Sequence, residues 1–166
     1  TGDGEVDQIY RRGSQVFVYE NGRQVWKSPG EWQVTDLAIG DPNDDGRSEI
    51  ILSVRKPDTA GIMRSHPFIV GYRQGAYRLM WGGSAVSEPI RELELADVDA
   101  DGKQELIVLE DACMGKQTVS VWHWHGWGFT LTWRSESGWY QNLGIINGED
   151  SHPDRFQVEK RWAPAE

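Results

Sequence analysis

The sequence predicts an all-β protein made of repeated units, and three observations support this prediction. Short apolar runs recur along the 166 residues, and 19 glycines punctuate them. Tight-turn signals such as Asn21-Gly22 stand between neighbouring runs, which is typical of β-hairpins. An acidic loop of nine residues occurs twice with the same flanking pattern. Repeats of this kind determine how the whole chain is organised.

The acidic loop is the strongest of these signals. In residues 97–105, carboxylates stand at relative positions 1, 3, 5 and 9, and Gly stands at position 6. Residues 41–49 have the same pattern, with Asn43 at position 3. Oxygens at alternate positions converge on one point, and Ca²⁺ takes six to eight oxygen ligands. The sequence therefore predicts two calcium loops, although clusters of Asp, Asn and Gly also form turns without a metal.

Two weaker copies of the loop lie near the ends of the chain. Asp3 and Asp7 stand at positions 5 and 9 of an incomplete first copy, and they are the candidate ligands of a partial metal site. In the last copy, Asn147 stands at position 1, but His152 replaces the Gly and Arg155 stands at position 9. We do not expect this last copy to bind a metal.

Strands are expected on both sides of each loop. Alternating segments at 37–41, 93–97 and 143–147 lead into the loops with two apolar residues on one face. Continuous apolar runs at 50–52 and 106–108 follow the full loops, which is typical of strands buried on both faces. Weaker versions of these second strands lie at 8–10 and 156–158.

A hairpin follows in each unit and ends in a Trp. The three hairpins are expected at 16–26, 68–81 and 119–133, with turns around 21–22, 74–75 and 126–128. The longest spacer, residues 56–67, holds two prolines and one glycine, and we expect it to be a loop between units.

A unit of strand, loop, strand and two-stranded hairpin is a β-propeller blade of four antiparallel strands. The loop glycines Gly4, Gly46 and Gly102 are 42 and 56 residues apart, as blades require. We expect about three units plus a partial one in a single domain, 1–166: 1–34 (partial), 35–90, 91–140 and 141–166 (partial). Because the chain starts inside a loop motif, we expect a fragment of a larger propeller, whose open blade edges allow self-association.

The two full loops, with the residues that precede them, resemble the calcium loops of FG-GAP/VCBS repeats. Those repeats build the β-propellers of integrin α-chain heads and of bacterial surface proteins. The resemblance implies Ca²⁺ as cofactor, and implies side-chain ligands with backbone carbonyls at position 7. The implied ligands are Asp41, Asn43, Asp45, Arg47 and Glu49 in the first loop, and Asp97, Asp99, Asp101, Lys103 and Glu105 in the second.

Three other motifs have weaker functional interpretations. His123 and His125 share one face of a predicted strand, but packing explains them better than a transition metal does. Ser53 and Lys56 fit an acyl-enzyme spacing, yet on a strand they face opposite sides. Trp127 lies between two glycines at a hairpin tip, and we expect it to be more exposed than the Trp residues that end the hairpins. It is the candidate ligand-binding residue.

Charge and motifs limit the function. The net charge of −9 argues against nucleic acid as a partner, and no apolar run is long enough to insert in a membrane. Because catalytic motifs are absent, we expect a non-enzymatic module for binding or adhesion, with a protein or carbohydrate partner. Weak calcium sites fill only at extracellular calcium levels, so an extracellular, cell-surface or periplasmic location is expected. The alternative is a segment of a polysaccharide-active propeller enzyme.

Overall fold

Residues 8–83, 88–148 and 152–161 are described by the structure, which is a computed structural model. Within these ranges every regular element is a β-strand except one 3₁₀ turn, Cys113–Gly115, so the predicted all-β class is confirmed. No helix in the described ranges has the length and apolar character needed to cross a membrane. The strands are β1 (Gln8–Arg12), β2 (Gln15–Glu20), β3 (Arg23–Lys27), β4 (Gln33–Gly40), β5 (Glu49–Pro57), β6 (Met63–Arg73), β7 (Ala76–Gly82), β8 (Ile90–Ala96), β9 (Glu105–Asp111), β10 (Gln117–Trp124), β11 (Phe129–Arg134), β12 (Tyr140–Ile146) and β13 (Arg155–Lys160).

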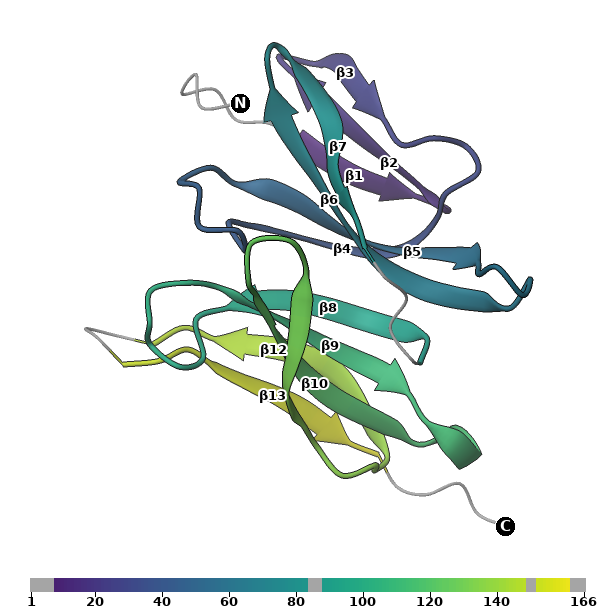
Figure 1. Cartoon of the computed structure of the whole chain (residues 1–166), viewed down its shortest axis with the longest axis vertical. Coiled ribbons are helices and arrows are strands. Elements are labelled where there is room, and N and C mark those ends of the chain that lie inside the picture. Colours follow the sequence, from purple (N-terminus) through teal and green to yellow (C-terminus); the bar gives the residue numbers. More distant parts are fainter. Residues whose placement is uncertain (1–7, 84–87, 149–151, 162–166) are drawn as a thin grey trace.

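The described strands form four antiparallel sheets in chain order. The first sheet is β1-β2-β3, the second β4-β5-β6-β7, the third β8-β9-β10-β11 and the fourth β12-β13. Each strand pairs with the next one along the chain within its sheet, so no crossover occurs inside a sheet. Figure 1 shows the sheets following one another down the long axis, from purple β1 at the top to yellow β13 at the bottom.

Turn chemistry fixes the first two outer hairpins. Asn21 and Gly22 have φ of 49° and 76°, and Gln74 and Gly75 have φ of 52° and 81°. Two consecutive positive φ values define the turn whose twist matches that of paired strands. These hairpins, and the third one between β10 and β11, lie where the sequence predicts them.

The spacer at residues 56–67 has a different structure from the one that the sequence predicts. It is not a loop between units but the tip of a hairpin inside the second sheet, because Pro57 of β5 pairs with Met63 of β6. Asp58 closes the tip by accepting the N–H groups of Ala60 and Ile62 at 2.8 and 2.9 Å. Its other carboxylate oxygen accepts Arg64 Nε at 2.7 Å, and this pairing lowers the pKa of Asp58.

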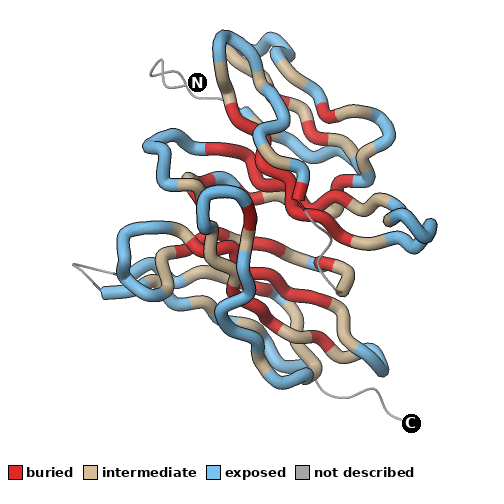
Figure 2. Tube along the Cα trace, viewed as in Figure 1, coloured by how far each residue is buried: buried red, intermediate tan, exposed pale blue. Residues whose placement is uncertain are grey.

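The hydrophobic core lies between successive sheets, and Figure 2 shows the buried segments running through the middle of the molecule. One buried cluster joins the first and second sheets, one joins the second and third, and one joins the third and fourth. The expected apolar face of β8 is buried through Leu93 and Leu95. In β4 the equivalent residue Ile39 is 53% exposed. The difference arises because β4 and its four-stranded sheet cover this face of β8, whereas only the three-stranded first sheet covers the same face of β4.

A pair of hydrogen bonds repeats between sheets, and we call these bonds the inter-sheet ties. Asp36 Oδ2 in β4 accepts the backbone N–H of Leu93 in β8 at 2.9 Å. Glu92 Oε2 in β8 accepts the backbone N–H of Leu143 in β12 at 2.7 Å. Asp36 and Glu92 both stand five residues before their acidic loops, so the two ties are equivalent. Each uses a carboxylate of one sheet to satisfy a backbone donor of the next.

Candidate metal centre

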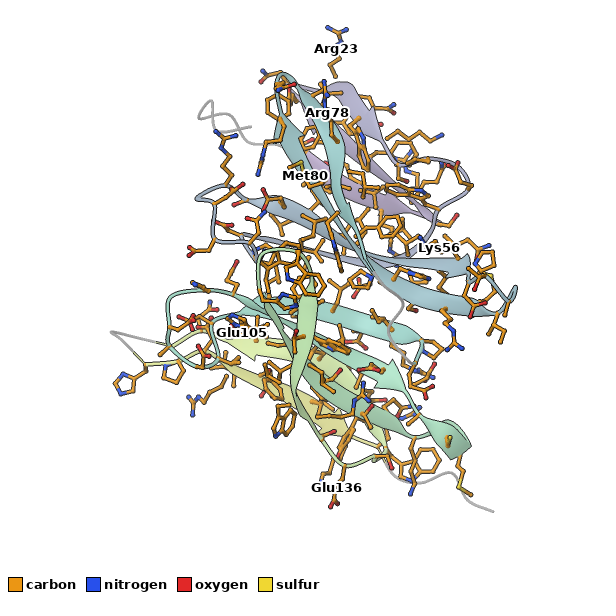
Figure 3. The ribbon with its side chains drawn as sticks, viewed as in Figure 1. Arg23, Lys56, Arg78, Met80, Glu105 and Glu136 are labelled. Atoms are coloured by element: carbon orange, nitrogen blue, oxygen red, sulfur yellow. The ribbon has the colours of Figure 1, made fainter. Side chains whose placement is uncertain are left out.

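The two acidic loops occupy equivalent places in the fold. Residues 41–48 connect β4 to β5, and residues 97–104 connect β8 to β9. Both connections lie on the left side of Figure 1. Position 9, Glu49 or Glu105, is the first residue of the following strand, so the sheet fixes its carboxylate under the loop. Glu105 is labelled in Figure 3, where oxygen-bearing side chains gather beside it.

The backbones of the loops match as well. Position 4 has a φ of 55° at Asp44 and 62° at Ala100. Position 6 has a φ of 80° at Gly46 and 87° at Gly102, a region that Gly enters without the steric cost of a Cβ. Ala100 adopts the left-handed region without being Gly or Asn, which is uncommon. The same spacing of residues therefore gives both loops the same backbone path.

Side chains at positions 1 and 3 hold each loop closed. The carboxylate of position 1 accepts the N–H of position 6, at 2.7 Å from Gly46 to Asp41 and 3.0 Å from Gly102 to Asp97. The side-chain oxygen of position 3 accepts the N–H of position 5, at 3.2 Å for Asn43 and 3.1 Å for Asp99. An ionised carboxylate has about four lone-pair positions, so these bonds leave capacity for a cation.

In the first loop the carboxylate oxygens converge. One oxygen each of Asp41, Asp45 and Glu49 lies within 4.8 Å of the others. Glu49 is 1% exposed, and its Oε2 has no hydrogen-bond partner among the described residues. Burial raises the pKa of Glu49, and Arg73 opposes that shift. Arg73 Nη2 donates to Glu49 Oε1 at 2.6 Å and also to the Asp45 carboxylate.

In the second loop two overlapping groups form. Oxygens of Asp97, Asp99 and Asp101 lie within 4.8 Å of one another, and so do ligand atoms of Asp99, Glu105 and His123. Glu105 is buried; its Oε2 accepts Val98 N–H at 3.1 Å, and its Oε1 lies 3.2 Å from His123 Nδ1.

The electrostatics of the second loop also favour a cation. Burial is the main cause that raises the pKa of Glu105, because the ionised form loses solvation. Asp97 Oδ1 is buried and lacks a hydrogen-bond partner within the described part of the chain. A divalent cation compensates both effects, since it stabilises ionised carboxylates and accepts their free lone pairs.

Each loop is also held by the next loop along the chain. Asp41 N–H donates to Gln104 Oε1 at 2.8 Å, and Asp97 N–H donates to Asp154 Oδ2 at 3.1 Å. Gln104 and Asp154 both stand at position 8 of their own loops. Asp154 also donates its backbone N–H to the Asp97 carbonyl at 2.8 Å. The loops thus form a connected row along one side of the molecule.

A cavity of about 330 Å³ opens between the loops and the β10–β11 hairpin. Asn43, Lys103 and His125 are among the residues that line it. Trp127 stands beside this cavity at the hairpin tip, and its ring lies 4.4 Å from the His125 ring. Trp127 is 78% exposed, more than Trp26, Trp81 or Trp133, so its predicted exposure is confirmed.

The remaining predicted residues separate into three groups. Arg47 and Lys103 lie on the exposed side of the loops, and the Lys103 N–H donates to Asp101 Oδ1 at 2.8 Å. Asp3 and Asp7, of the partial site, lie outside the described residues. Sequence reasoning missed Arg73, the contact of His123 with Glu105, and the position 8 bonds. Arg73 and the contact of His123 with Glu105 were missed because the partners lie far apart in sequence. The bonds from position 8 could have been predicted, because Gln104 and Asp154 share that position.

The donor set fits a hard divalent cation. Both loops offer oxygen ligands, and each holds one buried carboxylate oxygen without a partner among the described residues. A scan of known protein families finds no model that matches this chain, and a search of curated proteins finds no match either.

Proposed function

We propose that this chain is a calcium-stabilised module of β-propeller-type repeats that binds a protein or glycan partner outside the cell. The observation that carries the proposal is the duplicated loop. Two segments far apart in sequence share the spacing of their acidic residues, their positive φ values at positions 4 and 6, and their converging carboxylates. The shared spacing and backbone path, with carboxylates that converge in each loop, favour one common role over two unrelated turns.

Calcium would act here as a structural ion. In the second loop Asp97, Asp99, Asp101 and Glu105 would hold it, and in the first loop Asp41, Asn43, Asp45 and Glu49 would. The bound ion supplies positive charge where buried carboxylates otherwise lack compensation. The two loops connect β4 to β5 and β8 to β9, and each accepts support from the next loop along the chain, through Gln104 or Asp154. Filling a loop therefore stiffens the contact between sheets as well as the loop itself.

The binding role is supported by the exposed aromatic residue beside the cavity. Large exposed aromatic side chains at loop tips are typical contact residues, because they bury much area at small entropic cost. Trp127 lies next to a polar cavity whose walls come from both loops and the hairpin. Calcium that orders the loops would thereby order the walls of the partner site, which links the metal to the binding role.

Thermal unfolding in chelator and in about 1 mM Ca²⁺ tests the proposal. A site with a Kd of ~10⁻⁵ M adds about 2.7 kcal/mol to the free energy of unfolding, whereas a Kd of ~10⁻³ M adds about 0.4 kcal/mol. Magnesium at the same concentration is the control, because Mg²⁺ demands smaller octahedral sites. A melting temperature that is equal in chelator and in calcium refutes the metal role of the loops.

A further inference from the structure

The first loop already contains a cation that belongs to the chain. Arg73 comes from the end of β6, and its Nη2 contacts two of the three converging carboxylates, those of Asp45 and Glu49. The Arg73 side chain is 16% exposed, so it lies within the loop and not in solvent. In the described residues of the second loop, His123 rather than a guanidinium approaches the corresponding Glu105 at 3.2 Å.

The reason for this difference lies in the two strands that pair with β5 and β9. Ile50 pairs with Val70, which places Glu49 opposite Gly71; Leu106 pairs with Trp122, which places Glu105 opposite His123. A Cβ at Gly71 would lie 3.1 Å from both Arg73 Nη1 and Glu49 Cγ. The missing side chain at Gly71 therefore leaves the space through which Arg73 folds back onto the loop.

In the third sheet that space is filled. The residue equivalent to Arg73 is His125, two positions beyond His123, and its ring packs against Trp127 at 4.4 Å. The pair Gly71 and Arg73 in one sheet thus corresponds to His123 and His125 in the other. Only the first combination places a guanidinium on the carboxylates of its loop.

We propose that Arg73 is a built-in counter-ion that keeps the first loop from binding calcium tightly, so that the second loop fills at a lower calcium concentration than the first. This inference rests on the proposed calcium role of the loops. A metal ion and the guanidinium compete for the same two carboxylates, those of Asp45 and Glu49. Charge-assisted hydrogen bonds of this kind weaken metal binding roughly ten- to hundredfold when the metal must displace them.

The buried oxygen of Glu49 is the second observation that points to a ligand. Glu49 is 1% exposed, and Arg73 satisfies only Oε1, which leaves Oε2 without a partner in the described chain. Removing the guanidinium leaves both oxygens of a buried carboxylate without compensation. The first loop of such a variant has every ligand of a calcium site and no internal cation.

Calorimetric titration of the metal-free protein with Ca²⁺ tests this inference. In wild type the second loop is expected to bind calcium tightly, and in Arg73→Gln the first loop is expected to bind calcium ten- to hundredfold more tightly than the wild-type first loop does. Arg23→Gln is the charge-matched control, since Arg23 is exposed and points away from the molecule in Figure 3. Adding Asp41→Asn to Arg73→Gln should remove the gained site.

The alternative outcomes separate the two proposals. Two equally tight sites in wild type, or no gain in Arg73→Gln beyond that in Arg23→Gln, overturn the role of Arg73 and leave the calcium proposal intact. No calcium uptake by any variant refutes both. If Arg73→Gln is unfolded in chelator, refolding in 10 mM Ca²⁺ followed by circular dichroism supports the inference, and failure to refold overturns it. Arg73→Gln with Glu49→Gln lacks the uncompensated carboxylate and should gain no site.

Discussion

Replacing Asp36 tests whether the inter-sheet ties hold the second and third sheets together. Leu93 is 1% exposed, and its N–H donates out of its own sheet to Asp36 at 2.9 Å. In Asp36→Ala this buried donor loses its acceptor, and a buried unsatisfied N–H costs about 1–3 kcal/mol. In Asp36→Asn the amide oxygen remains as an acceptor of similar shape, so the bond survives without the charge.

The difference between the two variants isolates the hydrogen bond from the charge. Burial raises the pKa of Asp36 above its ordinary value of 3.8, so the ionised carboxylate is disfavoured in the folded state. Asp36→Asn removes that penalty and should equal or exceed wild type in stability at pH 7. Asp36→Ala should then be about 1–3 kcal/mol less stable than Asp36→Asn, and each kcal/mol lowers the melting temperature of a chain of this size by about 2–4 °C.

Urea unfolding of both variants in chelator, followed by circular dichroism, measures this difference without a metal contribution. The matched pair Glu92→Ala and Glu92→Gln should reproduce it, because Glu92 forms the equivalent bond to Leu143 at 2.7 Å. Alanine and asparagine variants of Asp36 that agree within about 0.5 kcal/mol would refute the reasoning, since a lost bond to a buried donor exceeds that value.

Three further predictions concern pH, the loops and the partner site. Burial and the nearby Asp36 carboxylate raise the pKa of Glu94, because they disfavour its ionised form in the folded state. The protein keeps its full stability below the ordinary pKa of 4.5 and loses part of it as the pH rises through the raised pKa. In chelator, Glu94→Gln should therefore lose less stability than wild type between pH 4.5 and 7 in urea titrations; an equal loss contradicts this. Asp99→Asn should weaken calcium binding in calorimetry more than Asn43→Asp strengthens it, because Arg73 limits the first loop; the reverse order contradicts this. Trp127→Ala should reduce binding on a glycan array at least tenfold with an unchanged melting temperature, and undiminished binding excludes Trp127 as a contact.

Much of the fold was predictable because local signals determine it. The turn at Asn21-Gly22 and the apolar runs around the loops specify hairpins within a few residues of sequence. The spacer at 56–67 was mispredicted because its prolines suggest a break in the chain. Pro67 is tolerated in β6 because it lies just beyond the last pair with β7, Phe68 with Gly82, where no ladder donor is required.

The candidate site was predictable only where its residues share one loop. The spacing of acidic residues identified both loops, since each ligand set is continuous in sequence. Arg73 stands 24 residues after Glu49. Their contact depends on the absence of a side chain at Gly71, and a periodic sequence pattern does not reveal such a contact. No sequence motif singled out Asp36, which directly precedes the strand predicted at 37–41. Its role emerges only when β8 is placed beside β4.

The inter-sheet ties have a consequence for how the molecule opens. The third sheet is bonded on one side through Leu93 and on the other through Glu92, whereas in the described chain the fourth sheet is bonded through Leu143 to one neighbour. Coupling of this kind runs between nearest neighbours, as in a one-dimensional array. Among the described sheets, the free energy of opening should then be higher for the third sheet than for the fourth. Backbone amides of β12 and β13 should therefore exchange with solvent earlier than those of β9, a difference that amide hydrogen exchange measures.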